Sequence, residues 1–314
     1  TRIMMASNVV IMLLFAINAI FRGAGAAYMA LWSLGLANAI NIVLDPLLIF
    51  GIGPFPELGV TGAAVATTIG RCCGVAYQVY HLTRAGGPFA VRWPDLRPVR
   101  EVLVNIVRIS AGGVGQFLIA SASWVFLVRI VSESGTDATA GYFVAVRIII
   151  FTLLPGWGLA NAAATLVGQN LGAGHPDRAA RSTWLCGHYN ALFMVSVAAF
   201  FWLTAPWLVS FFQQTPAADG YAVDALRIIS LGYLFYGYGM VFAQAFNGAG
   251  DSLTPTWMNV VCFWLLEIPL AWWLAKLLGW GPTGVFAAVA ISESALAVLS
   301  GVLFQRGAWR KVKV

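Results

Sequence analysis

Charged residues are scarce in this chain. Only 10% of its 314 residues are Asp, Glu, Lys or Arg, whereas 60% are hydrophobic and the mean hydropathy is +0.81. A soluble domain typically carries ~25% charged and ~45–50% apolar residues, so a water-soluble fold of this length could not bury the apolar surface. The composition therefore excludes soluble enzymes, disordered tails and disulfide-rich secreted domains. It predicts a polytopic membrane protein.

Motifs for catalysis and for metal binding are also lacking. The four cysteines lie inside apolar stretches and have no CxxC spacing: Cys72, Cys73, Cys186 and Cys262. The three histidines have no ligand spacing, and neither G-x-S-x-G nor H-E-x-x-H occurs. The formal charge is +6, but the Arg and Lys residues lie in short loops between apolar stretches. We therefore expect no enzyme, no cofactor and no nucleic-acid partner.

Nine apolar runs are each long enough to cross a bilayer, which takes about 17–25 helical residues. They cover residues 4–21, 27–51, 60–83, 101–131, 138–163, 183–212, 222–246, 254–278 and 283–304. Gly, Pro and charged residues separate them, as expected of loops. The predicted fold class is all-α, a polytopic helical membrane protein that contacts membrane lipid.

Basic residues predict the orientation. The loops on one side carry eleven of them: Arg22, Arg84, Arg92, Arg97, Arg100, Arg178, Arg181, Arg306, Arg310, Lys311 and Lys313. The other side has at most four: Arg2, Arg129, Arg227 and Lys276. The positive-inside rule then predicts that the first group and the C-terminus are cytoplasmic.

Three landmarks recur in the same order along the chain. Residues 21–25 match 246–250, residues 45–47 match 268–270, and residues 59–62 match 281–284, with offsets of 225, 223 and 222. The copies lie six spans apart, and an even number preserves orientation, so we expect a parallel repeat with a pseudo-two-fold axis along the membrane normal.

The repeat also predicts the domain organisation. In the second copy, the motif that contains Gly-Ala-Gly begins 145 residues after Glu101. In the first copy, the matching motif begins only 20 residues after Thr1. The difference predicts that about 125 residues, enough for three helices, precede Thr1. The chain would then supply nine of twelve transmembrane helices in two six-helix lobes. Residues 1–84 would end the first lobe, 85–100 would form a cytoplasmic linker, and 101–314 would form the second lobe.

Several segments together resemble the multidrug and toxic compound extrusion (MATE) family. Residues 21–25 (FRGAG) are similar to its FRGxGD-type turn, and residues 41–51 (NIVLDPLLIFG) and 59–67 (GVTGAAVAT) resemble the two helices that follow. Residues 166–174 (LVGQNLGAG) and 246–251 (FNGAGD) extend the likeness to the second lobe. The resemblance implies a monomeric secondary active antiporter in the bacterial plasma (inner) membrane. It would export organic, often cationic, compounds in exchange for Na⁺ or H⁺ by alternating access.

Asp45 is the sharpest candidate for ion binding. It lies midway in an apolar span, where an ionised carboxylate costs at least a few kcal/mol. Asn41 and Asn38 lie on the same helical face, and Pro46 leaves a backbone carbonyl without its helical donor. These groups favour a site for a hard cation or a proton. The alternative is an acid that is neutralised by hydrogen bonds and serves only helix packing.

The resemblance implies a fuller cation site in the first lobe. The positions that match it here are Asp45, Asn41, Asn18 and Thr67. A further aspartate from the family's first helix, which this chain does not contain, would complete the site, and Na⁺ is the only metal ion expected. Thr67 taken alone is also a typical helix-packing hydroxyl.

Glu267 and Glu293 are the other deep acids, and each could bind a cationic substrate, relay a proton or be a satisfied structural acid. Some family members carry second-lobe acids in the seventh and tenth helices, but the matching positions here fall near Ala120 and Tyr236, which argues against a cation site of that type. Gln116, Tyr236, Tyr238 and Gln244 could line a cavity, but we interpret them first as packing residues. Arg129 and Glu133 are four residues apart and are expected to pair.

Two other functions remain open at this point. A flippase for lipid-linked precursors, from the same superfamily, would need Arg and Lys deep in its cavity to hold phosphates. An uncoupled membrane channel or scaffold would show no dependence on Na⁺ or pH.

Overall fold

The computed structural model describes residues 2–84, 91 and 97–311, which form helices joined by turns and loops, with no strand among them. The chain divides into two compact units, Thr1–Val99 and Arg100–Val314. The all-α class is therefore confirmed. Most of the predicted linker, residues 85–90 and 92–96, lies outside the described residues, as do Arg92 and Lys313.

The described residues of the first unit form four helices: α1 (Arg2–Ala6), α2 (Asn8–Gly23), α3 (Ala27–Phe50) and α4 (Val60–Thr83). Close contact between α3 and α4 organises it, because α4 places buried small residues at every fourth position: Gly62, Ala66, Gly70 and Gly74. A Cβ atom at Gly62 would lie 2.3 Å from the Leu48 carbonyl oxygen, and one at Gly70 would lie 2.5 Å from that of Ala37. Small residues let membrane helices approach this closely.

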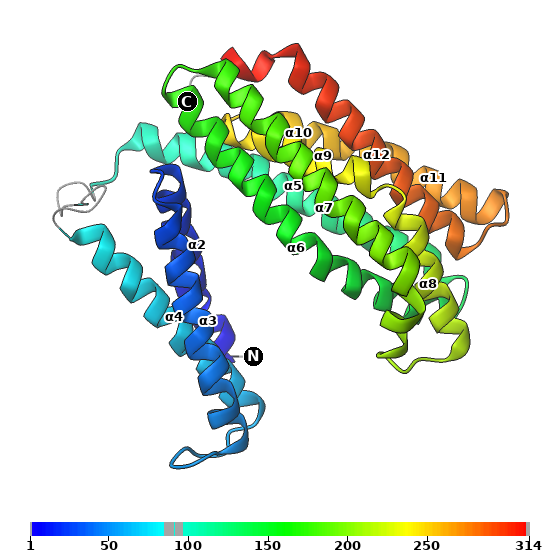
Figure 1. The fold of residues 1–314 in the computed structure, drawn as a ribbon, viewed down its shortest axis with the longest axis horizontal. Coiled ribbons are helices and arrows are strands. Elements are labelled where there is room, and N and C mark those ends of the chain that lie inside the picture. Colours follow the sequence, from blue (N-terminus) through cyan, green and yellow to red (C-terminus); the bar gives the residue numbers. More distant parts are fainter. Residues whose placement is uncertain (1, 85–90, 92–96, 312–314) are drawn as a thin grey trace. The chain divides into compact units, whose positions relative to one another are not determined.

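The second unit contains longer helices and a helical hairpin interrupted by π-helix. Its elements are α5 (Arg100–Ser132), α6 (Thr136–Gly172), α7 (Pro176–Ser210), α8 (Pro216–Ser230), α9 (Tyr233–Gly248), α10 (Leu253–Asn259), η2 (Val260–Glu267), α11 (Ile268–Trp272), η3 (Trp273–Leu277), α12 (Pro282–Arg306) and η4 (Ala308–Lys311). Helices α6, α7, α9 and α12 run beside one another and enclose the main core of this unit (Figure 1). Large apolar side chains also remain exposed on the outer faces, as on a lipid-facing surface.

The structure confirms a multi-pass membrane protein but differs from the predicted spans in detail. In the described part of the chain, six helices are long and apolar enough to cross a membrane, or seven if α8 and α9 form one span. The predicted continuous helix over 222–246 is wrong, since α8 and α9 meet at a 61° bend. Gly232 stands at the bend, where a Cβ would lie 2.9 Å from the Ala290 carbonyl oxygen of α12. Helix α2 is shorter than these six helices, and α4, which is rich in Gly and Thr, is not among them.

Both glycine landmarks of the predicted repeat adopt the same local geometry in each unit. Gly25 and Gly250 have φ values of 82° and 80°. The residue after each glycine donates its backbone N–H to the carbonyl of a phenylalanine five residues earlier: Ala26 to Phe21 in one unit, and Asp251 to Phe246 in the other. Gly59 and Gly281 likewise have φ values of 54° and 59° and precede α4 and α12. The left-handed φ requires glycine in these turns.

Glu133 forms its direct ion pair with Lys276 and not with Arg129, although the charge of Arg129 also helps to lower the pKa of Glu133. Glu133 Oε2 lies 2.5 Å from Lys276 Nζ, at the end of η3, so the loop after α5 is held to the hairpin instead. The hydrogen bond and charge of Lys276 lower the pKa of Glu133 below its ordinary value of 4.5. Helical spacing indicated a local partner, but the fold supplies a cation from a distant segment.

Candidate functional site

Asp45, Asn41 and Thr67 come together between α3 and α4 in the first unit. Asn41 Nδ2 donates to Asp45 Oδ1 at 3.3 Å and to Thr67 Oγ1 at 3.2 Å. All three side chains are partly buried. A Cβ at Gly70 would lie 3.5 Å from the Asn41 Cβ, so the small residues of α4 allow this contact. The cluster brings a carboxylate, an amide and a hydroxyl into one place inside apolar helices.

The composition of this cluster limits what it can hold. It contains one carboxylate, and among the described residues no three His, Cys, Asp or Glu side chains gather into a metal-binding group. Divalent cations favour several charged oxygen ligands, whereas a single carboxylate balances one positive charge. The cluster therefore fits a monovalent cation or a proton better than a divalent metal.

Asn18 does not join the cluster. Its Oδ1 accepts from Ser33 Oγ at 3.1 Å and from Gln78 Nε2 at 2.7 Å, and all three side chains are fully buried. Ser33 lies eight residues before Asn41 on α3, which places the two groups about 12 Å apart along the helix axis. Asn18 thus belongs to a separate polar network that joins α2, α3 and α4.

Glu267 is enclosed in the second unit. Only 2% of the residue is exposed, and one carboxylate oxygen, Oε2, accepts a hydrogen bond from Ser123 Oγ at 2.7 Å. Glu267 is the last residue of η2, a π-helical segment, and π-bulges frequently accompany functional sites. The Ser123 bond ties α5 to the hairpin.

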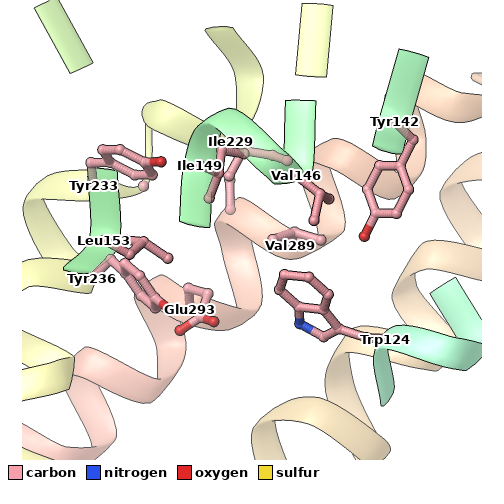
Figure 2. Close-up of a pocket in the computed structure, with 12 residues that line it drawn as sticks. Trp124, Tyr142, Val146, Ile149, Leu153, Ile229, Tyr233, Tyr236, Val289 and Glu293 are labelled. Carbon is pink, nitrogen blue, oxygen red and sulfur yellow. The ribbon is translucent and has the colours of Figure 1, made fainter. Parts of the chain in front are cut away.

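Glu293 lies on α12 and faces a cavity. Its Oε2 atom is shielded from solvent, and no hydrogen-bond partner for it occurs within the described chain. The side chain lines both a cavity of about 470 Å³ and an adjoining smaller recess. In Figure 2, Glu293 has Tyr236 on one side and Trp124 on the other.

The larger cavity is apolar with a few amide groups. Glu293 is the one acidic side chain among the described residues that line it, and no Lys, Arg or His is among them. Gln116 and Gln244 also line it, and Gln116 forms a reciprocal amide pair with Asn247: Gln116 Nε2 donates to Asn247 Oδ1 at 3.0 Å, and Asn247 Nδ2 donates back to Gln116 Oε1 at 3.2 Å. Its volume falls within the ~300–1,000 Å³ typical of small-molecule sites.

Some of the lining residues were among the candidates from the sequence. Gln116, Tyr236 and Gln244, for which packing was the first interpretation and a cavity the alternative, line the cavity, as does Ala120, whereas Tyr238 is not among the described lining residues. Trp124 carried no distinguishing signal, because a tryptophan in an apolar helix is equally typical of a membrane-interface belt. The position of Gln116, a polar residue within an apolar run, was the sequence feature that pointed to its place in the cavity.

Long apolar helices, a partly buried polar cluster with one carboxylate and a ligand-sized cavity define a multi-pass membrane protein of the transporter class. A family model described as MatE matches residues 114–273, about half of the chain. The chain belongs to the MatE family, whose members are transporters rather than enzymes.

Relatives and solved structures agree with this placement. A protein of Thermotoga maritima named probable multidrug resistance protein NorM is 27% identical over 95% of this chain, and the match covers 65% of that relative. An FAD transporter of Shewanella oneidensis is 28% identical over 75% of the chain and 52% of its own length. A MOP superfamily transporter from Pyrococcus furiosus has the same fold, with a TM-score of 0.91 and 23% identity over 99% of this chain and 69% of that one. The chain thus spans between about half and just over two thirds of the length of these proteins.

Proposed function

We propose that this protein is part of a secondary active exporter that moves small organic, often cationic, molecules out of the cell in exchange for inward Na⁺ or H⁺ by alternating access. The observation that carries the proposal is the cluster of Asn41, Asp45 and Thr67 inside apolar helices. Family membership supports transport, and the NorM-type relatives are named as multidrug resistance proteins.

The cost of an uncompensated charge explains how such a cluster would couple transport. An ionised aspartate at the centre of a membrane helix costs about 2.5–3.5 kcal/mol or more, and a bound cation or proton removes most of that charge. Occupancy would therefore shift the balance between two cavity states, by as much as the ion's affinities for them differ. A membrane potential adds ~2.3 kcal/mol per charge per 100 mV to inward movement.

The charge of the second-unit cavity supports cationic cargo. Glu293 lines it, and no Lys, Arg or His is among its described lining residues. A flippase for lipid-linked phosphates would place basic side chains there, because phosphate groups need cationic partners. The same reasoning disfavours a flavin dinucleotide, although one relative is named an FAD transporter.

The topology proposed with this function follows the basic residues. We place the C-terminus in the cytoplasm of a bacterial cell, with the chain as a monomer in the inner membrane. Residues 1–84 would complete one lobe, 85–100 would form the linker, and 101–314 would form the other lobe. Asn18 would act outside the first ion shell, since it bonds to Ser33 and Gln78. Glu267 would relay a proton or hold structure rather than meet cargo, since it is enclosed beside Ser123.

Efflux from proteoliposomes tests the proposal. The full chain is reconstituted, loaded with a fluorescent organic cation, and given an imposed Na⁺ or H⁺ gradient. We expect one of these ions to accelerate efflux in the wild type and Asp45→Asn to abolish that acceleration. The matched control is Asp224→Asn, which makes the same chemical change at an exposed position on α8 and should keep it. Ion-dependent efflux that persists in Asp45→Asn would refute the assignment, and efflux that no ion changes would favour an uncoupled channel.

A further inference from the structure

The cavity of the second unit continues into a recess with a different character. The cavity measures about 470 Å³ and the recess about 40 Å³. Four residues line both spaces, which therefore adjoin: Trp124, Leu153, Tyr236 and Glu293. The recess extends from them between apolar side chains of α6, α8 and α12, including Ile149, Ile229 and Val289.

The groups at the junction suit a positive charge. Figure 2 shows the Glu293 carboxyl between the rings of Tyr236 and Trp124. Aromatic faces attract ammonium groups, and Trp and Tyr are the stronger partners. Glu293 Oε2 is shielded from water and has no hydrogen-bond partner among the described residues. Buried polar atoms without a partner are rare in folded proteins, and the charge of a cationic head group, with or without an N–H to donate, would compensate this oxygen.

The sizes of the recess and the cavity suit two different parts of one ligand. A buried water requires roughly 10–15 Å³ of such space, so a recess of about 40 Å³ holds about three or four waters or one compact head group. The cavity beside it is large enough for an apolar body of drug size. Bulky cations with a charge spread over several rings would be confined to the cavity, away from the recess walls.

We infer that the second unit binds organic cations with one compact ammonium group, which enters the recess against Glu293, Trp124 and Tyr236 while the apolar body fills the cavity. This inference rests on the proposed export function for its physiological meaning, because it assigns the cargo site. It concerns binding alone, so it can be tested without transport.

Ligand pairs test the head-group requirement on the unmodified protein. The full chain in lipid nanodiscs is titrated calorimetrically with benzyltrimethylammonium, its neutral carbon isostere neopentylbenzene, and benzyltriethylammonium. We expect the neutral isostere to bind about tenfold more weakly or worse, because it lacks the charge for the carboxylate and the rings. The triethyl compound should also bind more weakly, because its head group exceeds the recess. Equal affinity for the charged and neutral ligands would overturn the inference.

Two variants locate the site. Glu293→Gln preserves shape and should weaken benzyltrimethylammonium binding about tenfold, whereas the matched Glu101→Gln, at an exposed position on α5, should not. Val289→Ala enlarges the recess and should reduce the preference for trimethyl over triethyl head groups. If Glu293→Gln does not fold, the ligand pairs and Val289→Ala still decide. Unchanged binding in folded Glu293→Gln, or an unchanged head-group preference in Val289→Ala, would place the site elsewhere.

These results separate the inference from the proposed function. Selective binding that depends on Glu293, with no ion-dependent efflux, would retain the site and reject the exporter. Ion-dependent efflux without head-group selectivity would retain the exporter and reject the site.

Discussion

The contact between α3 and α4 allows a quantitative prediction about the Asp45 cluster. A Cβ added at Gly70 would lie 2.5 Å from the Ala37 carbonyl oxygen, so Gly70→Ala forces the helices apart by roughly 1 Å to reach ordinary contact. Such overpacking costs about 1–3 kcal/mol. The Asn41–Thr67 hydrogen bond, already 3.2 Å long, would be stretched beyond bonding distance.

The matched control is Gly35→Ala on α3, where an added Cβ meets nothing within 4 Å. Both variants gain the same helix propensity, so their difference isolates the steric contact. We expect Gly70→Ala to unfold at lower SDS concentration than Gly35→Ala, with helix content followed by circular dichroism, and to lose part of its ion-dependent efflux. Equal stability and equal efflux in the two variants would refute the view that close packing of α4 builds the ion cluster.

Two further predictions concern the second unit. Ser123→Ala removes the donor to the enclosed Glu267 carboxyl and should destabilise the protein by about 1–3 kcal/mol, measured by the same SDS titration. The control Ser132→Ala should have little effect, because the Ser132 hydroxyl bonds only within its own helix at an exposed site. Equal stability of the two variants would contradict a structural role for the Ser123 hydrogen bond. The Lys276 contact lowers the pKa of Glu133, so its stabilising effect is present above the ordinary value of 4.5 and is lost as the pH falls through the lower folded-state value. Lys276→Met should therefore melt below the wild type at neutral pH, and the two melting temperatures should converge under acid conditions; a constant difference across that pH range would show that the ion pair is not the cause.

The apolar runs and glycine turns were sufficient to predict the helical class and most helix positions. Long hydrophobic segments must become helices in a membrane, because their backbone groups have no other partners. Glycines with left-handed φ, such as Gly25 and Gly250, mark turns that no other residue adopts easily. These signals are local, so a sequence displays them directly.

Features that depend on distant contacts were not predictable in the same way. The bend before α9 lies where Gly232 comes close to α12, a contact between distant segments, while the hydropathy stays continuous across it. Asn41 and Asp45 share a helical face, and the structure brings them together with Thr67, whereas Asn18 bonds to Ser33 and Gln78 because the packing of α2 places it there. Residues that line a cavity and residues that pack a core have the same apolar pattern.

Reverse coupling tests the exchange of cargo for ions most directly. Proteoliposomes that contain the full chain receive an organic-cation gradient, with Na⁺ and H⁺ initially at equilibrium, and the movement of both ions is recorded as the cargo runs downhill. The cluster at Asp45 predicts that one of the two ions is driven against its own gradient in the wild type and in Asp224→Asn, but not in Asp45→Asn. Cargo that flows while both ions stay at equilibrium in the wild type would contradict coupled exchange.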